Sequence, residues 1–237
     1  MQENVVFQTI PTGSKLLDNM LGGGFLSYTI NEIYGEAGSG KTILLHQIAL
    51  ICSYKLNSKV FFIDNDGTFR IENIIKIIKR LRLNDENSVK SILNRIIVAK
   101  TLSLNDFKDK LEIIAMLNEM IPLVIIDPIT YYIRSLPRKE FENELKNIMF
   151  KIKQICDKGS CIIFSNQVTF KDNDKLKPVG NYLIEDFIHR RILLKKNNSI
   201  IQCIIELAEN KIENRRGMFR ITDVGFIGLK EKVSYYE

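Results

Sequence analysis

The chain has 237 residues, of which 45% are hydrophobic and 26% are charged, and its formal net charge is +6. These values are typical of a globular protein and exclude a disordered tail protein or a fibrous repeat. The positive charge permits an anionic partner without requiring one. No apolar run approaches the ~20 residues that span a bilayer, and no signal peptide opens the chain. We therefore expect a cytoplasmic protein without membrane contact, whose four cysteines are reduced and buried.

Apolar runs of strand length alternate with amphipathic segments along most of the chain. The pattern predicts helices at 14–20, 41–54, 70–83, 105–120 and 139–156, and strands at 28–34, 59–64, 95–99, 123–127 and 161–165. Continuous apolar strands separated by helices are typical of a parallel sheet covered on both faces. After residue 190, consecutive strands at 191–195, 200–207 and 218–221 predict antiparallel hairpins. No linker divides the chain, so we expect one α/β domain over residues 1–237, with a mostly parallel twisted sheet, helices on both faces and antiparallel C-terminal strands.

A phosphate loop lies between the predicted strand at 28–34 and the helix at 41–54. The pattern G-x-x-x-x-G-K-S/T is matched by Gly35, Glu36, Ala37, Gly38, Ser39, Gly40, Lys41 and Thr42. Backbone N–H groups of such a loop cradle phosphates, and the helix N-terminus adds partial positive charge. Lys41 is expected to reach the β and γ phosphates, and the Thr42 hydroxyl to bind Mg²⁺. Asp127, at the end of a predicted strand, is the candidate metal-side carboxylate, although an aspartate there can also be a turn residue.

Further segments carry a second set of signatures. They read TGSKLLD at 12–18, LGGG at 21–24, IDNDGTFR at 63–70, SNQV at 165–168, PVG at 178–180 and MFRIT at 218–222. Together with the phosphate loop, and in the same order, they resemble the RecA-like recombinase family. Within it they are most similar to the archaeal RadA/RadB group and its core-only RadB-like paralogues. The resemblance covers nearly the whole chain and implies a RecA-like P-loop NTPase core, ATP and Mg²⁺ as cofactors, and a role in DNA repair and homologous recombination.

The resemblance also implies roles for single residues, so that Lys41, Asp66 and Gln167 are the candidate catalytic residues. Asp66 stands at the position of the family's water-activating glutamate, and its side chain is about 1.5 Å shorter. Since a misplacement of about 1 Å can cost on the order of 10²-fold in rate, we expect slow ATP hydrolysis. Asp64 and Asp66 could instead cap the following helix. Gln167 resembles the family's γ-phosphate sensor. Asn73 replaces the arginine that stacks on adenine in the family, and Pro128 replaces a serine.

Two basic segments follow strands that end near the predicted nucleotide. Both interleave cations with aromatic residues, which suits single-stranded DNA with stacked bases. Solvated loops are the alternative. The resemblance favours ATP-dependent binding of single-stranded DNA through these loops, at 131–139 and 169–181. The candidate contacts are Arg134, Arg138 and Lys139 in the first loop and Lys171, Lys175 and Lys177 in the second.

The expected partners are single-stranded DNA and a principal recombinase or other repair proteins. The chain begins at the core, without the family's helical domain and polymerisation segment, so we expect a monomer or small oligomer and no long filament.

A KaiC-like regulatory P-loop ATPase, acting on proteins without DNA, is the alternative function. It shares the first signature and the phosphate loop, but carries two glutamates at the positions of Asn65 and Asp66 and lacks the GTFR sequence. A small-molecule kinase fits poorly because no arginine-rich lid is evident. His46 and His189 form no metal set with the cysteines, so we expect both to be structural.

Overall fold

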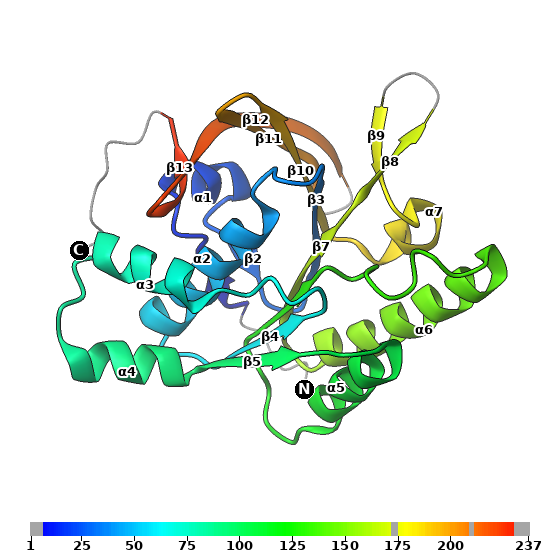
Figure 1. Cartoon of the computed structure of the whole chain (residues 1–237), viewed down its shortest axis with the longest axis horizontal. Coiled ribbons are helices and arrows are strands. Elements are labelled where there is room, and N and C mark those ends of the chain that lie inside the picture. Colours follow the sequence, from blue (N-terminus) through cyan, green and yellow to red (C-terminus); the bar gives the residue numbers. More distant parts are fainter. Residues whose placement is uncertain (1–6, 172–174, 209–210, 230–237) are drawn as a thin grey trace, which may run out of the picture.

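A nine-stranded mixed sheet is the centre of the computed structural model, which describes residues 7–171, 175–208 and 211–229 (Figure 1). The strand order is β13-β12-β11-β10-β3-β7-β6-β4-β5. The six strands from β10 to β5 are parallel, whereas β10 to β13 pair antiparallel. The strands are β3 (Ile30–Gly35), β4 (Val60–Asp64), β5 (Ile96–Lys100), β6 (Leu123–Asp127), β7 (Cys161–Asn166), β10 (Arg190–Asn197), β11 (Ile200–Ala208), β12 (Lys211–Thr222) and β13 (Gly225–Gly228).

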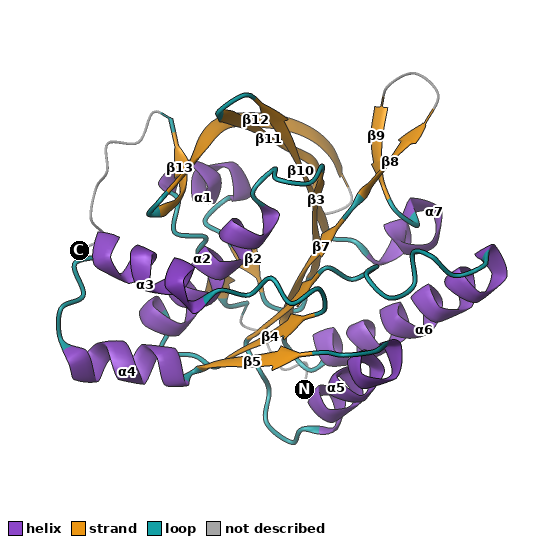
Figure 2. Ribbon diagram, viewed as in Figure 1, coloured by secondary structure: helices purple, strands orange, loops and turns teal. Residues whose placement is uncertain are grey.

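Helices cover both faces of this sheet, as the ribbon in Figure 2 shows. One face carries α1 (Lys15–Leu21) and α2 (Lys41–Lys55), with α3 (Ile71–Arg80) and α4 (Glu86–Asn94) packed against α2; the other carries α5 (Leu104–Met116) and α6 (Arg138–Asp157). Successive residues of β6 point to opposite faces, so Ile125 packs with α2 while Val124 and Ile126 pack with α5 and α6. The observed α/β architecture with antiparallel C-terminal strands confirms the fold class expected from the sequence.

The helix expected at 70–83 is shorter, and a second helix follows it. The first, α3, ends at Arg80, and α4 then begins at Glu86, a helix that the sequence pattern did not predict. The side chain of Asp85 caps α4 by accepting a hydrogen bond of 2.7 Å from the backbone N–H of Ser88. The sequence pattern missed α4 because the helix is short and largely polar, and only its Ile92 is buried, so it has little apolar periodicity.

The segment after β7 forms a hairpin, where the sequence predicted a basic loop at 169–181. It consists of β8 (Val168–Lys171) and β9 (Lys175–Pro178), which pair antiparallel in a small sheet of their own. The hairpin projects beyond the main sheet, at the upper right of Figure 1. A short helix α7 (Asn181–Ile184) and a 3-10 turn (Glu185–Phe187) lead from it to β10. Two further short strands, β1 (Thr9–Ile10) and β2 (Phe25–Leu26), pair near the start of the described chain.

The four cysteines are free and buried, as expected from the sequence. Burial raises the pKa of the Cys52 thiol to about 12, so this thiol stays protonated at neutral pH.

His46 is also buried. The centroid of its ring lies 4.7 Å from that of Phe69 and 5.5 Å from that of Phe62, and burial lowers its pKa to about 4. His189 accepts a 3.1 Å hydrogen bond from Ile30 N–H through Nδ1. Both histidines therefore make structural contacts. No helix in the described part of the chain is long and apolar enough to cross a membrane.

Candidate functional site

The phosphate-loop sequence joins the end of β3 to the first residue of α2, at the carboxyl edge of the parallel strands. Two of its glycines are required by close packing. A Cβ atom at Gly35 would lie 2.3 Å from the Leu194 carbonyl oxygen, and one at Gly40 would lie 2.7 Å from Ile221 Cδ1. Gly40 is also the N-cap of α2 and has a left-handed φ of 94°. The loop therefore keeps its backbone close to β10 and β12, and the amino end of α2 faces the loop.

Lys41 folds back over the loop that precedes it. Its Nζ donates hydrogen bonds of 2.7 Å to the Gly35 carbonyl and 2.9 Å to the Glu36 carbonyl. Burial lowers the pKa of the ammonium group, while the nearby carboxylates of Asp127 and Asp66 oppose that shift. An ammonium group held between backbone carbonyls beside a helix N-terminus is placed to bind a phosphate oxygen.

Asp127, the last residue of β6, is buried next to the first turn of α2. Its Oδ1 accepts a hydrogen bond from the Ser165 hydroxyl on the neighbouring strand β7, and its Oδ2 has no hydrogen-bond partner in the described part of the chain. Burial raises the pKa of Asp127 to about 6, and the hydroxyls of Ser165 and Thr42 offset the shift only in part. An unpartnered buried carboxylate oxygen is costly unless a cation or a donor reaches it.

These groups fit a divalent cation of the magnesium type. The carboxylate of Asp127 and the hydroxyl of Thr42 are the oxygen ligands that Mg²⁺ prefers, and Mg²⁺ keeps several waters and substrate phosphates as its other ligands. The unpartnered Oδ2 of Asp127 is the observation that supports this fit.

Asp66 lies at the rim of the site, in the turn after β4. Its Oδ1 accepts hydrogen bonds from the Thr68 backbone N–H at 3.2 Å and from the Thr68 hydroxyl at 2.6 Å. Asp64 accepts from the backbone N–H groups of Thr68 and Phe69 at 3.0 and 3.1 Å. Both carboxylates thus stabilise the 64–69 turn. They do not cap α3, because its N-cap is Arg70, without a side-chain cap bond.

A cavity of about 430 Å³ brings the candidate nucleotide-site residues together. The residues that line it come from the carboxyl ends of four strands, β3 with its loop, β4, β6 and β7, and from the segments that follow them. The sequence did not place Ser165, Pro128 or Arg134 in this site. Ser165 could have been found from its position at the end of the strand beside β6, whereas Arg134 was expected to contact DNA. The lining residues are Gly35, Ala37, Gly38, Lys41, Thr42, Asp66, Asp127, Pro128, Arg134, Ser165, Gln167 and Val168.

Asn166 connects the sheet to the residue just before the first segment expected to bind DNA and to the end of the second. Its Nδ2 donates to Glu32 Oε1 and to the Val179 carbonyl, both at 2.9 Å, and its Oδ1 accepts from the Thr130 hydroxyl at 3.1 Å. The fully buried Glu32 in turn accepts a 2.6 Å hydrogen bond from Arg191 Nε on β10. One buried amide therefore joins β3, the segment after β6 and the end of the hairpin. Only the fold brings these residues together, because they are far apart in the sequence.

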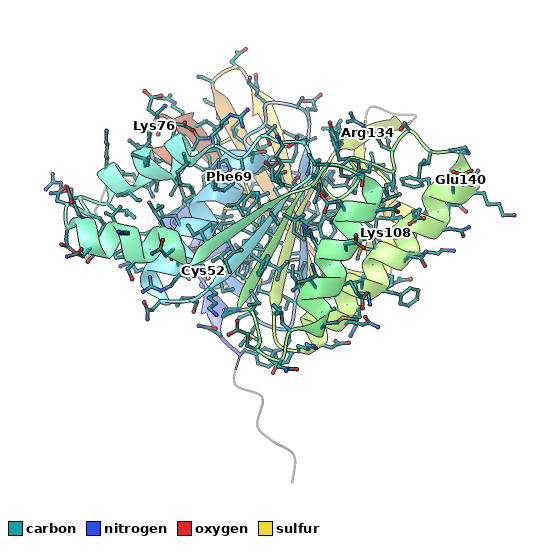
Figure 3. All side chains as sticks on the ribbon, turned by 60° about the horizontal axis from the view of Figure 1, so that its bottom comes forward. Cys52, Phe69, Lys76, Lys108, Arg134 and Glu140 are labelled. Atoms are coloured by element: carbon teal, nitrogen blue, oxygen red, sulfur yellow. The ribbon has the colours of Figure 1, made fainter. Side chains whose placement is uncertain are left out.

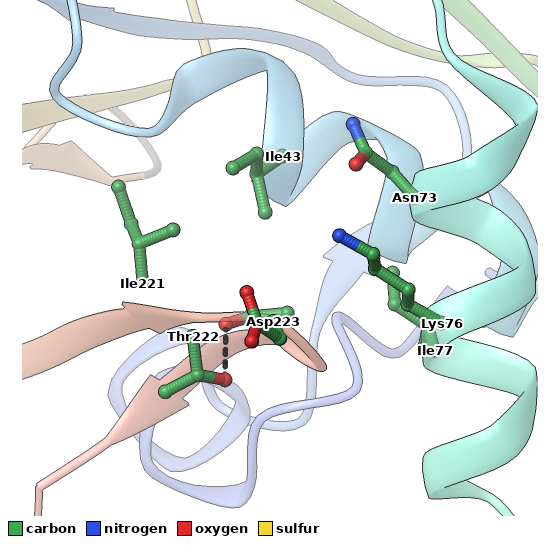
Figure 4. A pocket seen from close by; sticks show the side chains of 8 residues that line it. Ile43, Asn73, Lys76, Ile77, Ile221, Thr222 and Asp223 are labelled. Atoms are coloured by element: carbon green, nitrogen blue, oxygen red, sulfur yellow. Dashed lines mark hydrogen bonds between the residues drawn. The ribbon is translucent and has the colours of Figure 1, made fainter.

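A second cavity, of about 480 Å³, lies beside the first turn of α2 and is drawn in Figure 4. Asn73 and Lys76 project from α3 on one side, and Ile221 and Asp223 lie on the other. Asn73 lies at the position where the sequence resemblance leads one to expect an arginine that stacks on adenine. Its Nδ2 lies 3.4 Å from His46 Nδ1, so its amide is partly engaged with the core.

The candidate DNA contacts lie in different surroundings. Arg138 and Lys139 are exposed in the first turn of α6, and Arg138 pairs with Glu142 at 2.9 Å. Lys177 on β9 is exposed and borders a third cavity, of about 540 Å³, between the hairpin and strands β10 to β12. The side chains of Lys171 and Lys175 lie outside the described residues. The charged groups that line this third cavity are Lys177, Arg191, Lys195, Arg216, Glu185 and Glu206.

This geometry first defines the class of the molecule: an α/β P-loop protein with a phosphate loop after one parallel strand and an acidic residue at the end of another. The comparisons with known proteins then give the family. The Rad51 family model matches residues 2–228, and the chain therefore belongs to the Rad51 family of RecA-like recombinases. It is similar to the "DNA repair and recombination protein RadA" of Metallosphaera sedula, with 27% identity over a 247-residue alignment that covers 97% of this chain and 75% of the relative.

Proposed function

We propose that this chain is an ATP-binding DNA repair and recombination protein, of the RadB-like paralogue type, that binds single-stranded DNA in an ATP-dependent manner. The observation that carries the proposal is the 430 Å³ cavity, in which Lys41, Thr42 and Asp127 meet Gln167, the residue that leads into the basic hairpin. The Rad51 family assignment and the similarity to a RadA protein support the role in recombination. The roles that we propose for the single residues follow from their positions.

The triphosphate of ATP would lie along the loop before α2. Lys41 would exchange its hydrogen bonds with the loop carbonyls for bonds to the β and γ phosphates. Thr42 and Asp127 would hold Mg²⁺, which supplies positive charge to the phosphate oxygens when bound. The cavity in Figure 4 would receive the base, since it adjoins α2 and contains Asn73 at the position expected to contact adenine.

Departures from the family pattern support an accessory role with slow hydrolysis. The carboxylate of Asp66 is shorter than that of a glutamate, and its Oδ1 is already bonded to Thr68. Asn73 cannot stack on a base as a guanidinium group does. Weak nucleotide turnover fits a protein that uses ATP to change conformation and assists a principal recombinase or another repair protein. We propose a monomer or small oligomer as its working form.

We expect Asp66→Glu to raise the rate of ATP hydrolysis, by up to about 10²-fold if reach is what limits the chemical step. The longer side chain would bring its carboxylate nearer to the attacking water. Asp66→Asn, which keeps the size but loses the charge, should lower the residual rate. Steady-state phosphate release with and without single-stranded DNA measures both variants. Wild-type rates in both would show that Asp66 takes no part in the chemical step.

A titration of labelled single-stranded DNA tests the proposed function most directly. We expect a non-hydrolysable ATP analogue to strengthen binding relative to ADP by about 1 to 3 kcal/mol, the range typical of coupled sites. Gln167→Ala should remove this difference and leave the basal affinity nearly unchanged. Lys175→Ala and Lys177→Ala should weaken binding in every nucleotide state and reduce the salt dependence by about 0.7 per lost phosphate contact.

The outcomes of this titration separate the candidate functions. Equal affinity with the ATP analogue, with ADP and without nucleotide would contradict the ATP switch but not DNA binding. Absence of DNA binding at low salt, together with normal ATP binding, would support a KaiC-like regulatory ATPase that acts on protein partners.

A further inference from the structure

Arg134 has a different environment from the other basic residues of the segment that follows β6. It lines the 430 Å³ cavity together with Lys41, Thr42 and Asp127. Its Nη1 donates a 2.6 Å hydrogen bond to Gln167 Oε1, across 33 positions of the chain. Figure 3 labels Arg134 at the upper right of the view. The side chain therefore joins the segment after β6 to the first residue after β7.

Local contacts hold Arg134 in this position. Its backbone N–H donates a 3.0 Å hydrogen bond to the Thr130 carbonyl. The preceding residue, Ile133, is buried in the core and anchors this turn. The guanidinium carbon lies 5.6 Å from the centroid of the Tyr131 ring, a cation–π distance. Among the described residues, no carboxylate forms an ion pair with Arg134. Its positive charge thus remains available to a ligand in the cavity.

Arg138 provides the contrast, although it lies only four residues further along. It begins α6, and although both arginines are exposed, the guanidinium of Arg138 is paired with Glu142. It does not line the nucleotide cavity. Two arginines that look equivalent in the sequence therefore differ in direction and in charge compensation.

We propose that Arg134 binds the γ-phosphate of ATP, together with Gln167, and that it distinguishes ATP from ADP. This inference rests on the proposed nucleotide site and assigns to it a residue that the sequence had placed with DNA. The guanidinium group has five N–H donors, of which one bonds to Gln167, so further donors can reach a phosphate oxygen. The Gln167 oxygen is occupied by Arg134, which leaves its amide N–H groups to donate to the same phosphate.

The arrangement gives both segments a contact that exists only with ATP. The γ-phosphate would draw Arg134 from the segment after β6 and Gln167 from the segment after β7 toward one point. ADP lacks this group and would leave only the direct bond between the two side chains. A ligand shifts a conformational equilibrium only through such a difference in affinity for the two states.

The test compares nucleotide affinities, measured by calorimetry without DNA, for a non-hydrolysable ATP analogue and for ADP. We expect Arg134→Gln to weaken binding of the ATP analogue by about tenfold or more, the effect of losing a charge-assisted hydrogen bond. Binding of ADP should change less than about twofold. Arg134→Lys should retain part of the ATP affinity because it keeps the charge. Lys90→Gln, which removes a positive charge from an exposed position of α4 outside the cavity, is the control and should bind both nucleotides as the wild type does.

Circular dichroism and thermal unfolding without nucleotide establish that each variant is folded. If Arg134→Gln binds the ATP analogue and ADP as the wild type does, the inference is wrong. Weaker binding of single-stranded DNA by that variant in all nucleotide states would then identify Arg134 as a DNA contact. If the wild type itself binds no nucleotide, the proposed function fails as well, so the two failures are distinguishable.

Discussion

Lys41→Ala is expected to abolish tight binding of Mg²⁺·ATP, with a loss of affinity of at least about a hundredfold. The ammonium group would make hydrogen bonds to charged phosphate oxygens, and such bonds contribute about 1.5–3 kcal/mol each. Two of them correspond to a factor of about 10² or more in the dissociation constant. The fold should persist, because the hydrogen bonds that are lost are those to the carbonyls of Gly35, the last residue of β3, and of Glu36 in the loop that follows.

Calorimetric titration with Mg²⁺·ATP measures this loss, and circular dichroism checks the fold. Lys90→Ala is a suitable control, since Lys90 is exposed on α4 and does not line the cavity. Unchanged affinity in Lys41→Ala would remove the assignment of this loop as a phosphate-binding site. A comparable loss in Lys90→Ala would indicate a general effect of charge.

Asp127→Asn is expected to have two opposite effects. Without nucleotide it should stabilise the protein at pH 7.5, because the carboxylate that it replaces is buried with an unpartnered oxygen. The pKa of Asp127 is about 6 in the folded protein. An exposed aspartate titrates near 3.9, and a difference of about two units corresponds to a cost of ~3 kcal/mol once the group is ionised. The asparagine amide is itself buried, so we expect a net gain of about 1–3 kcal/mol.

The direction of the pH effect follows from which state binds the proton more tightly. Between about pH 4 and pH 6 the folded protein holds a proton on Asp127 that the unfolded chain has released. The free energy of unfolding of the wild type therefore falls as the pH rises through this range, and the cost remains above pH 6. The advantage of Asp127→Asn should be present at pH 7.5 and should disappear near pH 4.

With Mg²⁺·ATP the same substitution is expected to be harmful. Asparagine lacks the negative charge that a divalent cation needs, so the stabilisation that Mg²⁺ adds to nucleotide binding should be lost. Urea unfolding at pH 4.5 and pH 7.5 without nucleotide measures the first effect, and thermal unfolding with ATP, with and without Mg²⁺, measures the second. Asp109→Asn, at an exposed position of α5, is the control. Lower stability of Asp127→Asn without nucleotide would contradict the burial cost, and an unchanged Mg²⁺ dependence would contradict the metal assignment.

The sequence by itself determined the features that depend on local pattern. The alternation of apolar strands and amphipathic helices identified the parallel sheet, because a strand buried on both faces must be apolar throughout. The phosphate loop was recognised from its glycines and from its place between strand and helix. The position of Asp127 beside it followed from the general rule that parallel strands present their carboxyl ends at one edge of the sheet.

The tertiary structure alone decided where side chains with ambiguous roles lie. Arg134 and Arg138 are both basic residues of one segment, yet one reaches Gln167 in the nucleotide cavity and the other pairs with Glu142 on the surface. The hairpin of β8 and β9, the helix α4 and the links made by Asn166 were also not evident from the sequence. The physical reason is the same in each case. A side chain's hydrogen-bond partner can come from a segment more than thirty residues away, and only the packing of strands and loops brings the two together.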